Sequence, residues 1–347
     1  MYTMPLITAR LGELKLIKKK LALLFIASIL FIVGCGSDNG DNSNGEDGVY
    51  TVRIATAMDR TNPQMAGYPH FERIVEENLG DKVKIQYVGG PESIPAFNQG
   101  EAIQNGAIDM SWVASSYYAE LVPEALITNF TGYSYEEERE KGSIEYLSSL
   151  HEEKMNAVLV GRASELPGGN YTIYLANDIE VNSMEDFDGL RIRGTATYTP
   201  LLERMGADTI SMPGEEIYSA LERGIIDGFA WAAYSVSDLG VEELVGSQVL
   251  PKFNRSDQLV LANLDFWNDL PEEIQDGLRD AVIESYYLMQ EDISDLEEQE
   301  QAELMEHGAK MVELTDGDEY VDIALEASWE WMADRVDDIE ALKEYFR

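Results

Sequence analysis

Apolar and polar residues alternate from Val49 to Ala57, and this pattern predicts a β-strand. Residues 68–79 then place apolar side chains at helical spacing and end before Gly80, and residues 83–88 predict another strand. A strand, a helix and a strand in this order predict an α/β unit with a largely parallel sheet. Such sheets bind ligands at the carboxyl ends of their strands, so we look for function in the loops that follow the strands.

Three loops meet that condition in the first part of the chain. They span residues 58–69, residues 89–94 with Pro91, and the stretch after Trp112, which contains Tyr117 and Tyr118. A second α/β segment is expected over residues 158–249, with strands near 171–176 and 190–193. The sequence shows no convincing internal repeat.

Two long helices are expected toward the end of the chain. The first has an apolar stripe of Val282, Tyr286, Met289, Ile293 and Leu296, which continues toward Leu304 and stops by Gly308. A helix of that length suits a spine packed along two lobes. The second is expected over residues 320–345, where Met and Trp side chains share one face and are assigned to the core.

The first 34 residues have the order of a signal peptide. Arg10 and four lysines precede the apolar stretch Leu21–Val33, which only Ser28 interrupts. This stretch is shorter than the roughly 20 apolar residues of a membrane-spanning helix. It leads to Gly34-Cys35, and the site is similar to the bacterial lipobox, in which a cysteine receives a diacylglycerol. Cys35 is therefore predicted to anchor the protein, and as the single cysteine it can form no intrachain disulfide.

Residues 36–48 read GSDNGDNSNGEDG, so residues 35–48 are predicted to be a lipidated cysteine with a flexible acidic tether. About 300 residues follow, which is more than one hydrophobic core usually organises and predicts two lobes. The net charge of the chain is −40 at pH 7. Such a field repels nucleic acid, and any anion site must be built from local positive charge and backbone donors.

Several kinds of catalytic chemistry have no motif in this chain. The three histidines have no metal-ligand spacing, and there is no nucleophile elbow, phosphate-binding loop or dinucleotide fingerprint. Asp316-Gly-Asp318 lacks the other ligands of a calcium loop, so a turn is the better interpretation. We therefore expect no enzyme activity, no cofactor and no bound metal.

An ordered set of motifs runs through the chain. The motifs are LRIRGTATYTP at 190–200, MGA at 205–207 and MPGEEIYSALERGIIDG at 212–228, with FNQGEAIQNGAIDM at 97–110 before them and NLDFWNDLP at 263–271 after them. This set closely resembles DctP-type binding proteins of TRAP transporters, which are secondary transporters fed by an extracytoplasmic binding subunit. The resemblance covers most of residues 50–300.

The resemblance implies a two-lobed α/β fold, similar to type II periplasmic binding proteins, with hinge strands and a long spine helix. On the family plan, lobe I comprises residues 49–163 and 257–292, and lobe II comprises residues 164–256 and 293–347. The lobes would close on a small organic anion, which is then delivered to TRAP permease subunits. The protein would be extracytoplasmic, in the periplasm or on the outer face of the cytoplasmic membrane.

In the family, the last arginine of the Leu-Arg-Ile-Arg motif binds the ligand's carboxylate, and it falls on Arg193. A guanidinium matches two carboxylate oxygens with two parallel donors. Two departures limit how far the family's binding residues can be assigned to this chain. Many relatives have a second arginine at about the position of Thr172, and Trp231 replaces an asparagine that contacts the ligand in relatives. Ala230 stands where some relatives have an acidic side chain that assists metal-bridged ligands. A sialic-acid-like ligand and a bound metal are therefore disfavoured.

The complete set of candidate ligand contacts adds aromatic side chains near predicted strand ends and two further residues. It comprises Arg193, Trp231, Trp112, Tyr117, Tyr118, Tyr198, Tyr234, Glu216 and Pro91. The aromatic character predicts an apolar or aromatic carboxylate. The alternatives are a binding subunit of an ABC importer or a chemosensor, and a surface enzyme acting on an organic acid, which the missing catalytic motifs disfavour.

Overall fold

The structure is a computed structural model that describes residues 48–164 and 169–347. The predicted signal peptide, Cys35 and the tether up to residue 47 lie outside these residues. Within the described ranges, no helix is both long and apolar enough to cross a membrane.

Five strands form the first sheet, in the order β2-β1-β3-β10-β4. They are β1 (Tyr50–Thr56), β2 (Val83–Gly89), β3 (Met110–Val113), β4 (Ala157–Ser164) and β10 (Gln258–Asn263). β1 is parallel to β2 and β3, whereas β10 is antiparallel to β3 and β4. The alternation that predicted β1 is reflected in Val52 and Ile54, which are fully buried.

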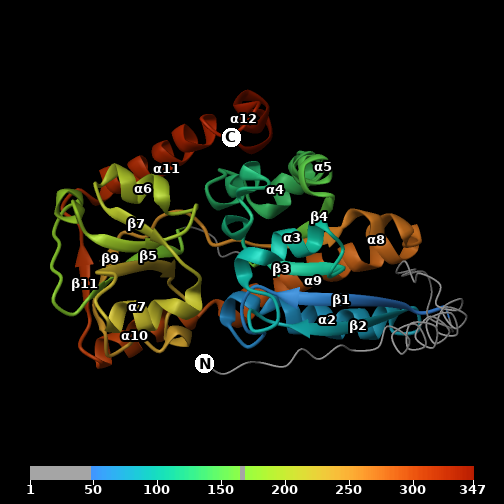
Figure 1. Cartoon of the computed structure of the whole chain (residues 1–347), viewed down its shortest axis with the longest axis horizontal. Coiled ribbons are helices and arrows are strands. Elements are labelled where there is room, and N and C mark those ends of the chain that lie inside the picture. Colours follow the sequence, from blue (N-terminus) through green and yellow to red (C-terminus); the bar gives the residue numbers. More distant parts are fainter. Residues whose placement is uncertain (1–47, 165–168) are drawn as a thin grey trace, which may run out of the picture. The chain divides into compact units, whose positions relative to one another are not determined.

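Six strands form the second sheet, in the order β11-β9-β5-β8-β6-β7 (Figure 1). They are β5 (Tyr171–Ala176), β6 (Arg191–Gly194), β7 (Asp208–Ser211), β8 (Gly228–Ala232), β9 (Val245–Leu250) and β11 (Lys310–Glu313). β6 is parallel to β7 and β8, and β5 is antiparallel to β8 and β9. The chain therefore leaves the first sheet after β4 and returns to it at β10.

The two sheets repeat one topology, which the sequence did not reveal. Three parallel strands (β2-β1-β3 and β7-β6-β8) are followed by an antiparallel pair (β10-β4 and β5-β9). Arg53 pairs with Asp109 in the first sheet and Arg191 pairs with Asp227 in the second, both at 2.6 Å. The shared sequence is short. It comprises Arg-Ile at 53–54 and 191–192 and Ala-x-x-x-Gly-x-Ile-Asp at 102–109 and 220–227, because packing elsewhere requires only apolar side chains of suitable size.

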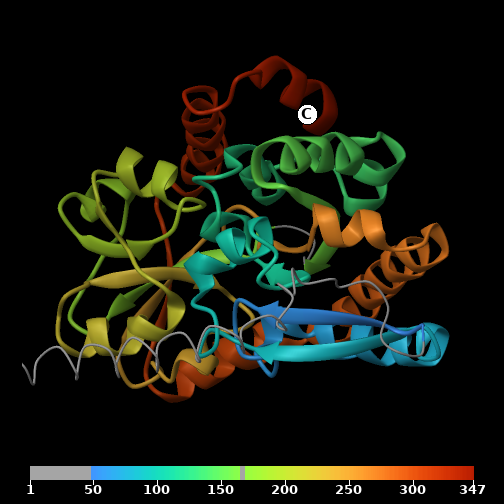
Figure 2. The same ribbon diagram turned by 45° about the vertical axis from the view of Figure 1, so that its right-hand side comes forward.

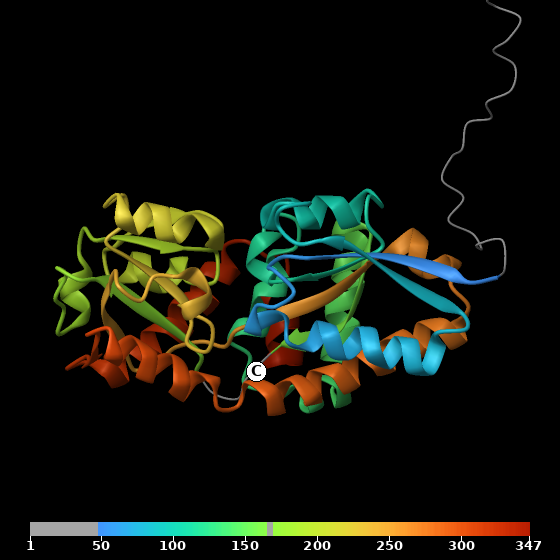
Figure 3. The same ribbon diagram turned by 90° about the horizontal axis from the view of Figure 1, so that it is seen from below.

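Eleven α-helices are present in the described residues. They are α2 (Gly67–Leu79), α3 (Gln99–Gln104), α4 (Tyr135–Glu140), α5 (Ser143–Met155), α6 (Thr199–Arg204), α7 (Ile217–Glu222), α8 (Leu264–Asp269), α9 (Glu272–Ile293), α10 (Leu296–Glu306), α11 (Gly317–Ala333) and α12 (Ile339–Phe346). α2 and α9 pack side by side, and α9 also contacts β4 (Figure 3).

Both long helices predicted from periodicity are divided in two. The apolar stripe from Val282 does continue to the buried Leu304, but α9 ends at Ile293 and α10 begins at Leu296. Ser294 lies at the break and its hydroxyl donates to a carbonyl of the preceding turn, a local contact that competes with helical pairing. The helix expected over 320–345 is likewise divided into α11 and α12, because Asp338 caps the amide of Ala341 and starts a new helix.

The last helix contacts elements of the first-sheet region, whereas α11 packs against α6 of the second-sheet region. α12 contacts α5 and the 3-10 turn Pro123–Asn129 (η4), as Figure 2 shows for the red and green helices. The Tyr345 ring stacks on Tyr146 with centroids 4.3 Å apart, and the Thr131 hydroxyl donates to the Phe346 carbonyl at 3.1 Å. The lobe boundaries stay a prediction, and α12 lies in the range 293–347 but contacts α5 and η4.

Candidate functional site

Arg193 lies on β6, and its side chain is fully buried. Nε donates to the carbonyl oxygen of Met212 at 2.9 Å, and Nη1 donates to that of Ala230 at 3.2 Å. Nη2 is buried and has no hydrogen-bond partner among the described residues. A buried donor without an acceptor is unfavourable, so the arrangement suits an acceptor that comes from outside the chain.

Trp231, on β8, lies beside Arg193. The guanidinium carbon is 5.2 Å from the centroid of the indole ring, which is a cation–π distance. The indole nitrogen donates to the carbonyl oxygen of Ser235 at 3.0 Å, so the orientation of the ring is fixed. Gly214 makes room for the ring, because a Cβ there would come within 2.6 Å of Trp231 Cη2.

Tyr117 belongs to the first-sheet region and interacts with Arg193. It ends the 3-10 turn Ser115–Tyr117 (η3), which follows β3. Burial raises the pKa of the Tyr117 hydroxyl, while the charge of Arg193 lowers it, so this hydroxyl lies in the field of the guanidinium. Phe97 packs edge-on against the Tyr117 ring, with centroids 4.9 Å apart.

Tyr198 supplies a second hydroxyl from the start of α6. Its ring packs edge-on against that of Tyr171, with centroids 4.7 Å apart. Burial raises the pKa of Tyr198, and Arg193 again acts in the opposite direction. Both tyrosines are therefore protonated at neutral pH and can donate to an anion. We call Arg193, Trp231, Tyr117 and Tyr198 the Arg193 cluster.

Buried hydrogen bonds link the two sheets next to this cluster. Gln64, in the loop after β1, donates from Nε2 to the hydroxyl of Ser235 at 3.0 Å. Gln258, on β10, donates to Gln64 Oε1 at 3.3 Å. Because the Ser235 carbonyl holds the indole of Trp231, this chain of contacts connects Trp231 to the first sheet.

Comparison with known protein families shows one match over most of the chain. The DctP family, described as bacterial extracellular solute-binding protein, family 7, matches residues 54–321. The chain belongs to this family. DctP-family proteins are solute receptors, and the predicted family and receptor class are therefore confirmed.

Known relatives and solved structures agree with the family. This DctP-family chain is 23% identical over 289 residues to the monocarboxylate 2-oxoacid-binding periplasmic protein of a Nostoc species, covering 81% of this chain and 78% of that protein. A TRAP solute-binding protein from Rhodoferax ferrireducens with bound malonate has a TM-score of 0.72 at 21% identity, covering 84% of this chain and 95% of that chain.

A Sulfitobacter relative with bound β-D-galacturonate has a TM-score of 0.73 at 19% identity, covering 86% of this chain and 99% of that chain. The predicted two-lobed binding-protein fold is confirmed by these structures.

Trp231 and Ala230 contact Arg193 in this DctP-family protein, and Thr172 lies next to Trp231. Thr172 on β5 is the direct cross-strand neighbour of Trp231 on β8. The Thr172 hydroxyl donates to the carbonyl oxygen of Val249. Ala230 contributes its backbone carbonyl to Arg193. In the described residues, no three His, Cys, Asp or Glu side chains come together to hold a metal ion.

Trp112 has partners in the interior of the first-sheet region. Its ring contacts those of Tyr68 and Phe71, with centroids 5.2 and 4.6 Å apart. The indole nitrogen is buried without a hydrogen-bond partner among the described residues. Packing therefore accounts for the ring but not for the nitrogen, and a ligand contact by Trp112 stays a prediction.

Tyr118 and Tyr234 also have partners within the protein. Burial lowers the pKa of His151 to about 4, so its ring is neutral. His151 Nδ1 then donates to Leu147 at 2.7 Å, and Nε2 accepts from the Tyr118 hydroxyl at 3.1 Å. The hydroxyls of Tyr234 and Ser256 lie 2.8 Å apart. Ligand contacts by Tyr118 and Tyr234 stay predictions.

Glu216 and Pro91 are less buried than the other candidates. Glu216 is exposed at the start of α7, and Pro91 is half-buried in the loop after β2. The carboxylate that acts on the buried Tyr117 hydroxyl is that of the neighbouring Glu215. Ligand contacts by Glu216 and Pro91 stay predictions.

Sequence reasoning missed several buried polar groups near the Arg193 cluster. The hydroxyls of Thr195 and Thr197, and the amide oxygen of Asn129, have no hydrogen-bond partner among the described residues. Asn129 and Thr197 line one small cavity. Two threonines directly after Arg193-Gly194 were a usable signal, since they sit in the family motif. The sequence around Asn129 gave no such signal, because only tertiary folding brings Asn129 near Thr197.

Proposed function

We propose that the chain is the lipid-anchored binding subunit of a TRAP transporter and captures a small organic acid by its carboxylate at Arg193. The binding lobes would close around the acid, and the receptor would deliver it to TRAP permease subunits. Family membership supports the receptor class and the transporter type, and the Arg193 cluster supports the ligand chemistry.

The proposal rests on one observation, which is that Nη2 of Arg193 is buried without a hydrogen-bond partner among the described residues. Met212 and Ala230 hold the guanidinium through Nε and Nη1, which leaves Nη2 free to donate. A carboxylate can accept from Nη2 and from the second hydrogen of Nη1 at the same time. The hydroxyls of Tyr117 and Tyr198 lie in the electrostatic field of the Arg193 guanidinium. In a chain with a net charge of −40, this local positive charge is what attracts an anion.

The cluster favours a small carboxylate with one further polar group. Trp231 offers an apolar face, while Thr195 and Thr197 offer hydroxyls without other partners among the described residues. A 2-oxo or 2-hydroxy acid combines these properties. The Nostoc relative is named for 2-oxoacid binding, and a Bordetella pertussis relative was solved with pyroglutamic acid.

A thermal-shift screen tests the ligand class. The panel contains pyruvate, 2-oxobutyrate, lactate, malonate and benzoate, with glucose and glycerol as uncharged controls. A ligand at a hundred times its dissociation constant adds about 2.7 kcal/mol to the free energy of unfolding, so a true ligand raises the melting temperature by several degrees. Stabilisation by the uncharged compounds alone would contradict the proposal.

Trp231 is expected to report ligand binding. The acid that binds Arg193 changes the surroundings of the adjacent indole, so it should change the intrinsic tryptophan fluorescence. Trp231→Phe should remove most of this change, whereas Trp267→Phe, on α8 beside Arg279, should keep it. A full-sized change in the Trp231→Phe protein would assign Trp231 to the core alone.

A further inference from the structure

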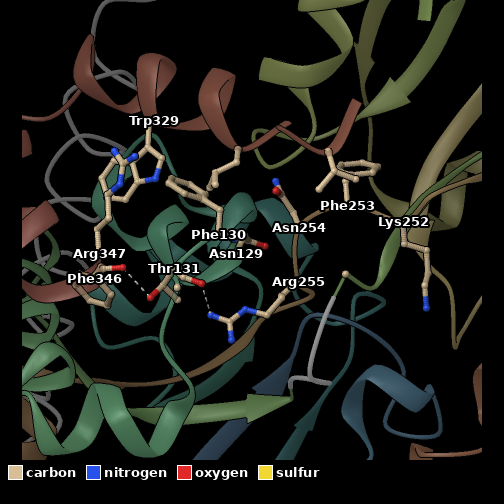
Figure 4. Close-up of a pocket in the computed structure, with 14 residues that line it drawn as sticks. Asn129, Phe130, Thr131, Lys252, Phe253, Asn254, Arg255, Trp329, Phe346 and Arg347 are labelled. Atoms are coloured by element: carbon tan, nitrogen blue, oxygen red, sulfur yellow. Dashed lines mark hydrogen bonds between the residues drawn. The ribbon is translucent and has the colours of Figure 1, made fainter. Parts of the chain in front are cut away.

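A cavity of about 430 Å³ lies beside the segment that connects β9 to β10, and no member of the Arg193 cluster lines it. Its walls are residues 252–255 of that segment, residues 129–132 at the end of η4, Gly169, one face of α11, and the end of α12 (Figure 4). The walls therefore come from elements that pack on different sheets, since α11 contacts α6 and α12 contacts α5.

The body of the cavity is apolar and aromatic. Val321, Leu325 and Trp329 follow one another at four-residue spacing along α11, and all three line the cavity. Val321 and Leu325 are 40% and 42% exposed, so this face of α11 presents apolar surface to the cavity. The Phe130 ring packs edge-on against Trp329, with centroids 5.3 Å apart. A flat apolar group would find both a face and an edge to pack against.

The charged side chains that line the cavity are all cationic. They are Lys252, Arg255 and Arg347, although the whole chain has 65 acidic and only 25 basic residues. A region without acidic side chains in such a protein favours an anion. An adjoining cavity shares Leu325, Trp329 and Arg347 with this one. Its other charged lining residues are Asp322, Glu326, Glu330 and Lys343.

The three cations differ in how far they are already engaged. Lys252 pairs with Glu297, and its side chain points away from Trp329 in Figure 4. Arg255 Nη2 donates to the carbonyl oxygens of Thr131 and Tyr133 at 2.9 and 3.0 Å. The Arg347 guanidinium lies 5.6 Å from the centroid of the Trp329 indole, and it forms no ion pair with another side chain in the described part of the chain. Arg347 is therefore the cation most open to a ligand.

We propose that this cavity is a second binding site, which takes an aromatic monocarboxylate. The ring of the ligand packs against Trp329, Phe130 and Leu325. Its carboxylate meets the guanidinium of Arg347 at the rim. The volume of the cavity is large enough for a two-ring acid.

Calorimetric titration with 2-naphthoate tests the proposal, using an Arg193→Lys background in which binding at the Arg193 cluster is weakened. One molecule of 2-naphthoate should still bind to each protein. Leu325→Trp, which fills the cavity, and Arg347→Gln, which removes the charge, should each lower the affinity about tenfold. The neutral 2-naphthamide should bind about tenfold more weakly than the acid.

Met305→Trp is the matched control, because Met305 is 56% exposed on α10 and does not line the cavity. This variant should keep the affinity for 2-naphthoate. The substituted positions are exposed, so melting temperatures should be similar in all variants. Absence of 2-naphthoate binding in the Arg193→Lys background, or equal affinity in the Leu325→Trp, Arg347→Gln and control proteins, would overturn the proposal.

Discussion

Replacing Arg193 with lysine is expected to weaken binding of the organic acid about ten- to a hundredfold, because lysine keeps the charge but loses the paired donors. Arg193→Ala should weaken it further, since the buried site then has no positive charge. Both variants are to be titrated calorimetrically with the best acid from the screen. Near-wild-type affinity in Arg193→Ala would overturn the assignment of Arg193.

Stability must be measured beside affinity, because Arg193 also holds the fold locally. Its Nε and Nη1 donate to two buried carbonyl oxygens, so Arg193→Ala should lower the free energy of unfolding by about 1–3 kcal/mol even without ligand. Arg191→Ala is the matched control on the same strand. Arg191 pairs with Asp227 at 2.6 Å and is partly exposed. Its loss should therefore destabilise the protein without lowering the affinity for the ligand.

Cys35→Ser is expected to abolish membrane anchoring in the native host. Lipid attachment requires the thiol, and a hydroxyl at this position cannot replace it. The mutant protein should be released from membranes or retained as an uncleaved precursor, which membrane fractionation and diacyl labelling detect. Ser37→Ala, two residues further along the predicted tether, leaves the lipobox intact and should stay anchored. Unchanged labelling of the Cys35→Ser protein would refute lipidation there.

Local patterns were sufficient to predict β1, β2, β5, β6 and the first helix. The alternation at β1 and the helical spacing of α2 reflect burial on one face, which is a property of each segment by itself. The breaks at Ser294 and before Asp338 were missed because an apolar stripe can continue across a break in the helix. The repeated topology of the two sheets was missed because strand pairing defines it, while only a few side chains, such as the two Arg–Asp pairs, recur in the sequence.

The candidate site was only partly accessible from the sequence. Arg193 and Trp231 could be named because the family motif places both beside the ends of neighbouring strands. The link from Gln258 through Gln64 to Ser235 could not be found, because these residues are far apart along the chain and meet only in the folded protein. The cavity beside Trp329 was likewise hidden, since its walls come from five separate segments.

The most direct test of the central claim is a calorimetric comparison of one acid with its own amide. The best acid from the screen and the corresponding primary amide have nearly the same shape and differ mainly in charge. If Arg193 recognises a carboxylate, the amide should bind the wild-type protein at least about a hundredfold more weakly, since it loses charge-assisted hydrogen bonds worth about 1.5–3 kcal/mol each. Equal affinities for the acid and the amide would contradict the account.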